Sequence, residues 1–296
     1  MPFGLLAGLG AALAWGSLDL ITALGSRVIG SLRVTASMQL VTAVLFLAIF
    51  VVTGSSLPGD ARSFALAALL GIIGAGAYLA YFTGLQMGPI AVVSGMVAAF
   101  GGLTVVLSVV FRGETLTLLQ AAGATIATIG VLLTGIAFDG GLRATRFASP
   151  GVVFALVALI LFSLMAITTD IALETMTWVQ TYTIARVLNA AIGIAAVAIL
   201  ARTAAAIGHR PEGGPAWSDG RIVGAIVLAG TLDVIGLIAF AIGLETAPTW
   251  MVGLAASFGP AVTIVVAVAF LGERLKRIQW VGLAGILVGM VCIAIP

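Results

Sequence analysis

Long apolar stretches alternate with short polar breaks along this chain, and the pattern predicts membrane-spanning helices. A helix needs about 20 apolar residues to cross the hydrocarbon core of a bilayer. The apolar stretches lack the strict alternation that a membrane β-barrel requires. We therefore predict an all-α integral membrane protein with ten transmembrane helices, near residues 3–24, 34–53, 63–85, 89–111, 116–137, 149–170, 180–200, 221–243, 248–271 and 277–295.

Composition agrees with this prediction. Of the 296 residues, 61% are hydrophobic and only 8% are charged, whereas a soluble domain has about 25% charged residues. The formal net charge of +2 gives no indication of a nucleic-acid partner. The single cysteine, Cys292, and the single histidine, His209, exclude an internal disulfide and a thiol cluster, so we predict no metal and no cofactor.

The two halves of the chain resemble each other. Residues 84–133 align with residues 243–292 at an offset of 159, and 14 of these 50 positions are identical. Chance matches among apolar residues do not explain the coincidence of proline, glutamate and glutamine. These polar and proline matches are Pro89 with Pro248, Glu114 with Glu273, and Gln120 with Gln279.

The earlier helices align at an offset near 147, which places Gln39 opposite Arg186. We predict a first five-helix repeat over residues 1–137 and a second over residues 149–296. Because five is an odd number, the second repeat enters the membrane in the opposite direction. Inverted repeats of this kind are typical of transporters that alternate access around a site near the midplane.

The residues that mark the two halves also resemble a known family. Ala14-Trp15-Gly16-Ser17 in the first helix and the Gly-Glu pairs at Gly113-Glu114 and Gly272-Glu273 resemble the EamA type of the drug/metabolite transporter superfamily. The resemblance implies a secondary transporter, of an amino-acid exporter subtype, in a bacterial inner membrane. It also implies that helices 1–3 and 6–8 line a central cavity. The family often has an arginine early in the second helix of each half, whereas here Arg186 has Gln39 as its counterpart.

Ionisable side chains inside the predicted helices are the first candidates for a site, because a charge at the bilayer centre is costly to insert. Asp19, Arg186 and Asp233 lie within helices, and Asp170 lies nearer an interface. Two interpretations remain open for Arg186 and Asp233. They form a structural ion pair, or one or both contact a zwitterionic substrate.

Polar and aromatic side chains on the same helices complete the candidate set. Tyrosine and tryptophan combine an apolar body with a polar group, which suits an amphipathic solute such as an aromatic or branched amino acid. We expect Glu114 and Glu273 to pair with Arg112 or Arg274, and Pro260 to kink its helix. The predicted substrate-binding residues are Trp15, Ser17, Asp19, Gln39, Tyr78, Tyr81, Ser163, Tyr182, Arg186, Asn189 and Asp233.

We expect the protein to move small metabolites, exporting amino acids, by alternating access around a central cavity. The chain has no phosphate-binding loop of the Walker type, so it is not expected to hydrolyse ATP. Its expected partners are a small-molecule substrate and the lipid bilayer, with no indication of an oligomeric state. Two alternatives are an intramembrane enzyme that uses Asp19 and Asp233 as a dyad, and a membrane scaffold subunit.

Two arguments on orientation disagree. The family resemblance implies cytoplasmic termini. The second argument is the distribution of positive residues, which concentrate in cytoplasmic loops. The loops on the side of the termini contain only Arg62 and Arg112, which favours external termini. The loops on the opposite side contain Arg27, Arg33, Arg143, Arg146, Arg202, Arg210, Arg221, Arg274, Lys276 and Arg277.

Overall fold

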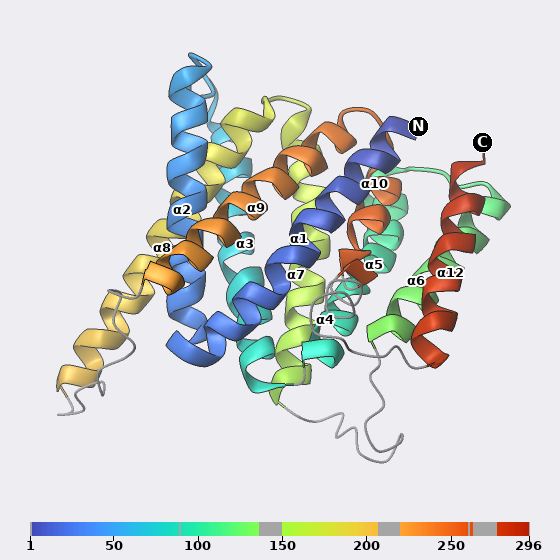
Figure 1. Cartoon of the computed structure of the whole chain (residues 1–296). Coiled ribbons are helices and arrows are strands. Elements are labelled where there is room, and N and C mark those ends of the chain that lie inside the picture. The colour runs from blue at the N-terminus through green and yellow to red at the C-terminus, as the bar shows by residue number, and fades with distance from the viewer. Residues whose placement is uncertain are drawn as a thin grey trace.

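The computed structural model describes residues 2–88, 90–135, 150–206, 220–259, 261–262 and 277–295. The regular elements in this part of the chain are all helical (Figure 1). In order they are α1 (Pro2–Ile29), α2 (Ser31–Val52), α3 (Ala61–Met87), α4 (Ile90–Ala98), α5 (Phe100–Leu107), the π-helical segment η1 (Ser108–Arg112), α6 (Leu118–Gly135), α7 (Pro150–Leu173), α8 (Trp178–Ala206), α9 (Gly220–Leu244), α10 (Thr249–Ala256) and α12 (Arg277–Ala294).

Each of the ten predicted ranges contains helix, and the all-α membrane fold is confirmed. Seven helical segments of the described chain are long and apolar enough to cross a membrane. Helices α6 and α12 contain shorter apolar stretches, Leu118–Gly130 and Trp280–Ile293. The range 248–271 lies partly outside the described residues, as does Pro260 with its predicted kink. Ten crossings therefore stay a prediction.

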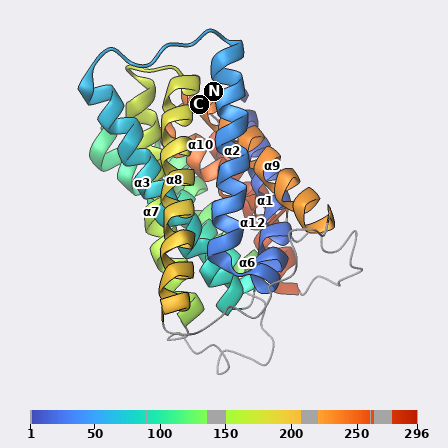
Figure 2. The same ribbon diagram turned by 90° about the vertical axis from the view of Figure 1, so that its left-hand side faces the viewer.

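The two halves run in opposite directions and interlock (Figure 1). Helix α1 begins at the end of the molecule where both termini lie, whereas α7 begins at the opposite end. Helix α1 packs along α9, and α7 packs along α3 in the equivalent way. Helix α2 packs along α8 (Figure 2), and α6 packs along α12. Every one of these long interfaces joins a helix of the first half to a helix of the second.

Glycine lets these helices approach closely. A Cβ atom built on Gly8 would lie 2.7 Å from Ala255 Cβ and 2.9 Å from the carbonyl oxygen of Val252. A Cβ atom on Gly289 would lie 2.6 Å from the carbonyl oxygen of Gly123, in the interface between α6 and α12. In lipid, small residues allow the close backbone packing that replaces the hydrophobic effect. These glycines therefore serve as packing residues between the helices.

Substitution of Gly8 by valine is expected to destabilise the protein by about 1–3 kcal/mol, because the added methyl groups overlap backbone atoms that cannot rotate away. The matched control is Gly224→Val in α9, where an added Cβ meets no atom within 4 Å. Thermal unfolding of the purified variants in detergent measures the difference. Equal unfolding temperatures for the two variants would contradict the packing assignment.

Charged side chains connect the two halves at the end of the molecule that holds the termini. Arg112 Nε lies 2.6 Å from Asp170 Oδ2, and Arg112 Nη2 lies 2.6 Å from Glu174 Oε1. The expected pairing of Arg112 with Glu114 was therefore wrong. The backbone turns between these two residues, so their side chains reach different helices. We call Arg112, Asp170 and Glu174 the terminal-side clamp.

Glu114 instead caps a helix of the other half. Its two carboxylate oxygens accept hydrogen bonds from the backbone N–H groups of Thr249, at 2.8 Å, and Trp250, at 3.2 Å. These groups belong to the first turn of α10, where a carboxylate satisfies unpaired donors and complements the helix dipole. Asp60 caps α3 in the same manner by accepting from the Ser63 N–H at 2.8 Å, and this hydrogen bond lowers the pKa of Asp60.

Candidate functional site

Two membrane helices are interrupted at equivalent positions. In the first half, α4 ends at Ala98 and α5 begins at Phe100. In the second half, α10 ends at Ala256 and is followed by a turn at residues 257–258. The two interruptions correspond at the offset of 159. Interrupted helices at matching positions of an inverted repeat are the best structural indication of where a ligand binds.

The two interruptions lie against each other. Gly101 packs so closely on Ser257 that an added Cβ would overlap the serine side chain. Ser163 Oγ lies 3.1 Å from the Phe100 carbonyl oxygen at the interruption and 2.9 Å from the Leu159 carbonyl oxygen of its own helix, so it can donate to either. At the position equivalent to Ser163, α1 has Gly16, whose Cα faces the backbone of the other interruption. Helices α1 and α7 therefore support the two interruptions in equivalent ways.

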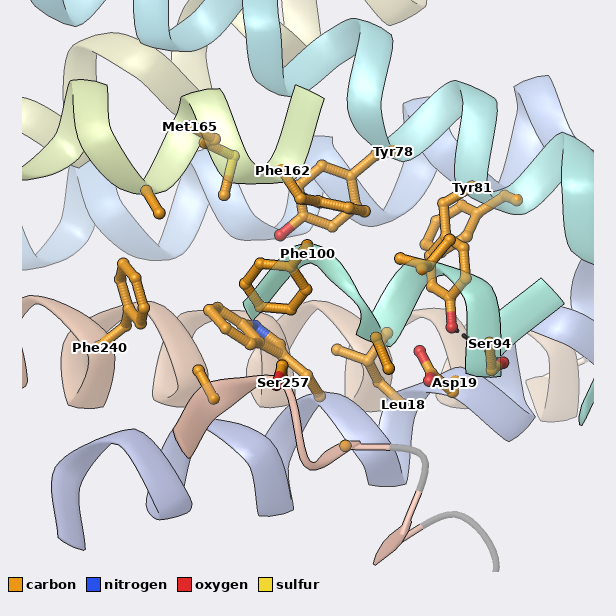
Figure 3. Close-up of a pocket in the computed structure, with 17 residues that line it drawn as sticks. Leu18, Asp19, Tyr78, Tyr81, Ser94, Phe100, Phe162, Met165, Phe240 and Ser257 are labelled. Atoms are coloured by element: carbon orange, nitrogen blue, oxygen red, sulfur yellow. Dashed lines mark hydrogen bonds between the residues drawn. The ribbon is translucent and has the colours of Figure 1, made fainter. Parts of the chain in front are cut away.

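A cavity of about 80 Å³ lies between these interruptions and the helices α1, α3, α7 and α9 (Figure 3). Fourteen of its 17 lining residues form seven pairs related by an offset of 147 or 159. The pairs are Trp15 with Phe162, Leu18 with Met165, Asp19 with Ala166, Tyr81 with Phe240, Val97 with Ala256, Ala98 with Ser257, and Phe100 with Gly259. The cavity therefore lies on the pseudo-twofold axis that relates the two halves.

One end of the cavity is polar. The Tyr81 hydroxyl lies 3.0 Å from Ser94 Oγ and also interacts with the Asp19 carboxylate. Figure 3 shows these three side chains together, with Phe240 and Met165 at the other end of the cavity. Asp19 is only 6% exposed although it lines the cavity. None of the ion pairs found in the described residues includes Asp19.

A second polar group lies beside the cavity, between α2, α3, α8 and α9. Asp233 accepts a hydrogen bond from the Tyr78 hydroxyl at 2.6 Å and one from Thr42 Oγ1 at 3.3 Å. Arg186 Nη1 lies 4.0 Å from Asp233 Oδ2 and donates to Gln39 Oε1 at 3.1 Å. We call these five residues the central polar cluster. Its two charges compensate each other, as buried charges normally must.

Tyr78 connects the central polar cluster to the cavity. Its ring lines the cavity, and the Arg186 guanidinium carbon lies 5.0 Å from the ring centroid. The indole of Trp15 also approaches Asp233, but without a well-formed hydrogen bond. The central polar cluster therefore packs directly behind the cavity wall.

The central polar cluster also follows the repeat. Arg186 has Gln39 as its counterpart, and Asp233 has Gly74 as its counterpart. A Cβ atom at Gly74 would lie 3.0 Å from Nδ2 of Asn189. Within the described chain, both amide atoms of Asn189 and Nε of Arg186 are buried without a hydrogen-bond partner. Gln39 Nε2 is also buried without a partner among the described residues, so the cluster has unused hydrogen-bonding capacity on the side of both halves.

The predicted site residues fall into three groups. Trp15, Asp19, Tyr78 and Tyr81 line the cavity. Gln39, Arg186 and Asp233 form the central polar cluster with Tyr78, and Asn189 lies beside it. The remaining three have other surroundings. Ser17 donates to the Leu13 carbonyl oxygen of its own helix, and Ser163 Oγ lies between the Leu159 and Phe100 carbonyl oxygens. Tyr182 packs its ring on Phe46.

The helices that line the cavity differ from those that the family resemblance implied. The second helix of each half, α2 and α8, contributes no lining residue among those described, and supplies the central polar cluster instead. The fourth helix of the first half lines the cavity through Ser94 and Phe100, and α10 does so through Ala256. The physical reason is the interruption of these helices, which brings their backbones close to the axis.

The sequence prediction missed several aromatic and polar lining residues, among them Phe162, Phe240 and Ser94. The repeat contained the signal that would have found two of them. Phe162 lies at the offset of 147 from Trp15, and Phe240 lies at the offset of 159 from Tyr81. Ser94 has glycine as its counterpart and leaves no such signal.

An inverted repeat of helices with a partly polar cavity on its axis is the architecture of a membrane transporter. The chain belongs to the EamA-like transporter family, whose family model matches residues 2–136 and again residues 149–295. It is therefore an integral membrane protein for which a transport function is supported. The comparison with curated protein sequences found no match.

A solved crystal structure has a similar fold over almost the whole length. The two structures superpose with a TM-score of 0.78, covering 98% of this chain and 96% of the other at 21% sequence identity. At that level of identity the similarity shows the fold alone.

Proposed function

We propose that this protein is a secondary transporter that moves small metabolites, amino acids among them, by alternating access around the cavity between the two interrupted helices. The observation that supports this proposal is the position of the cavity on the pseudo-twofold axis, with 14 of its 17 lining residues in equivalent pairs. A site on the axis can be exposed to either side of the membrane by equivalent movements of the two repeats. Export, and a location in a bacterial inner membrane, are proposed on the family resemblance alone.

The interlocked packing determines which bodies would move. Rocking of one sequence half against the other would separate α1 from α9 and α3 from α7, which are among the most extensive helix interfaces. Glycine-mediated packing of this kind behaves as a rigid unit, because close-packed interfaces do not deform continuously. We therefore propose that the moving bodies are mixed, one built on α1 and α9 and the other on α3 and α7.

The terminal-side clamp would hold one end of the molecule closed. Arg112 belongs to the first half, and its partners Asp170 and Glu174 belong to the second. The positions equivalent to Arg112 and Asp170 are occupied by Leu271 and Ala23, so the sequence does not repeat this clamp at the opposite end. In this proposal the clamp opens in the state that exposes the cavity to the side of the termini.

Weakening the clamp is expected to expose the cavity from that side. We suggest a Cys292→Ser background, which removes the only cysteine, with Ala256→Cys as a reporter in the cavity wall. Arg112→Gln in this background should raise the labelling rate by a membrane-impermeant thiol reagent several-fold from the side of the termini, because one cation no longer holds two carboxylates. Labelling of oriented vesicles from each side measures the effect.

The matched control for the clamp is Arg62→Gln, which removes an exposed arginine near the start of α3 on the same side. This control should leave the labelling rate unchanged. If Arg112→Gln raised labelling equally from both sides, or from neither side, alternating access governed by this clamp would be contradicted.

The two alternatives have less support. The described residues contain no group of three or more histidine, cysteine or acidic side chains that would hold a metal ion. Asp19 and Asp233 contact different tyrosine hydroxyls, Tyr81 and Tyr78 respectively, so they do not form the dyad that an intramembrane aspartyl enzyme would need. A scaffold subunit would not require a cavity lined by a carboxylate on the axis of the repeat.

A further inference from the structure

We propose that the cavity binds its solute in one orientation, with an ammonium group against Asp19 and an apolar, preferably aromatic, body against α7 and α9. This inference rests on the proposed transport function and specifies its substrate class as organic amines. A free carboxylate on the solute would contribute nothing to this recognition.

The asymmetry of an otherwise symmetric cavity supports the orientation. The polar end consists of Asp19, Tyr81 and Ser94, whose counterparts in the second half are Ala166, Phe240 and Gly253. The first half supplies a carboxylate and two hydroxyl groups at these positions, whereas the equivalent positions of the second half have no polar side chain. The second half contributes Ser257 to the lining, and its hydroxyl donates to the nearby Leu254 carbonyl oxygen. Figure 3 shows Asp19 and Ser94 at one end of the cavity and Phe240 at the other. A solute with one charged end and one apolar end matches this arrangement.

The charge of the solute follows from the environment of Asp19. A buried carboxylate is unfavourable unless a cation or several hydrogen bonds compensate its charge. Asp233 has such compensation from Arg186, Tyr78 and Thr42. Asp19 is also buried, at 6% exposure, interacts with Tyr81 alone among the side chains recorded around it, and faces the cavity. A cation bound in the cavity would complete the missing pair.

The aromatic side chains of the cavity wall also favour a cationic solute. Trp15 lies one helical turn before Asp19 on α1, and both line the cavity together with Tyr81. Aromatic faces attract ammonium groups by a cation–π interaction, and this attraction increases when the pair is shielded from water. Phe100, Phe162 and Phe240 supply an apolar surface for the rest of the solute.

The walls also exclude the opposite charge. The described lining includes no arginine, lysine or histidine, since the Arg186 guanidinium lies behind the Tyr78 ring and is directed at Gln39 and Asp233. An anionic solute would bring a second negative group next to Asp19 without a partner. Selection between an amine and an acid therefore combines an attraction with a repulsion.

A matched series of probes tests the charge preference in the unmodified protein. Phenethylamine, 2-phenylethanol and 3-phenylpropionate share a phenyl ring and differ in the charge of the polar end. Titration of the purified protein in detergent at neutral pH should show at least about tenfold tighter binding of the amine than of the acid, with the alcohol between them. Equal binding of the amine and the acid, or tighter binding of the acid, would overturn the inference.

Asp19→Asn tests the residue itself. The variant should lose at least about tenfold in affinity for phenethylamine and keep its affinity for 2-phenylethanol, because only the charge at the polar end has changed. Asp19→Glu, which keeps the charge, should retain the preference for the amine. Retention of the full preference in Asp19→Asn would overturn the assignment, and the series with unmodified protein remains decisive if this variant does not fold.

Flux measurements separate this inference from the function on which it rests. In proteoliposomes the same protein should transport labelled phenethylamine faster than labelled 3-phenylpropionate. Flux of both probes at equal rates would leave the transporter intact and overturn the charge preference. Selective binding of the amine without flux of any probe would contradict transport of this substrate class, while the inferred amine-binding site would remain supported.

Discussion

Arg186→Gln alone is expected to lower the free energy of unfolding by about 3–5 kcal/mol, the largest stability effect that the structure predicts. The variant leaves Asp233 as an uncompensated charge that is fully buried between α2, α3, α8 and α9. Glutamine is a conservative choice, because the first half already has Gln39 at the equivalent position. The loss would combine the missing charge with the space left by the shorter side chain.

The double variant Arg186→Gln/Asp233→Asn is expected to recover a large part of this loss, since removal of both charges leaves only neutral hydrogen-bonding groups. Unfolding of the two single variants and the double variant in detergent gives the coupling between the two residues. Arg202→Gln is the matched control, because Arg202 lies on the same helix and is exposed. Its effect should stay within about 0.5 kcal/mol. Additive losses in the double variant would show that the two charges do not interact.

The helices and the repeat could be predicted because both leave a local signal. Runs of apolar residues identify the spans, and the offset of 159 relates Glu114 to Glu273 without knowledge of any contact. The interruption of the fourth helix left a weaker signal. Ala98 and Ala99 have high helix propensity, and the break becomes apparent only where α5 and α10 pack together.

Sequence alone does not tell which of the candidate site residues face the cavity, and the reason is physical. A polar residue within a span satisfies its hydrogen bonds either in its own helix or across an interface, and sequence does not distinguish these cases. Ser17 bonds to its own helix at Leu13, whereas Ser163 Oγ lies between the Leu159 carbonyl oxygen of its own helix, at 2.9 Å, and the Phe100 carbonyl oxygen across an interface, at 3.1 Å. Asp19 and Asp233 look alike in the sequence, but only Asp233 has a buried cation beside it.

Glu114 illustrates the same difficulty in a loop. Its proximity to Arg112 in the sequence suggested an ion pair, but the free N–H groups of α10 are a stronger partner. Those groups are 135 and 136 residues away along the chain, and only the interlocked fold brings them near.

Filling the cavity is expected to have the largest effect on function. Ala166 lies in the cavity wall on α7 and is 2% exposed, so Ala166→Phe would place a ring in a space of about 80 Å³. A solute that must pass through this cavity would lose its site, and we expect the rate of flux to fall by about tenfold or more, which corresponds to about 1.4 kcal/mol of lost binding free energy. The matched control is Ile160→Phe on the same helix, where the side chain is 50% exposed on the outer surface of the helix bundle.

The most direct test of a transporter that works through this cavity is the flux of labelled solutes into proteoliposomes containing the unmodified protein, Ala166→Phe or Ile160→Phe. Amines and amino acids should be tested, with equal amounts of folded protein verified by size-exclusion chromatography. The account predicts saturable flux for the unmodified protein and for Ile160→Phe, and its loss in Ala166→Phe. Saturable flux that is undiminished in Ala166→Phe would contradict the assignment of the cavity as the transport site. The absence of saturable flux for every solute tested would contradict the proposed transport of amines and amino acids.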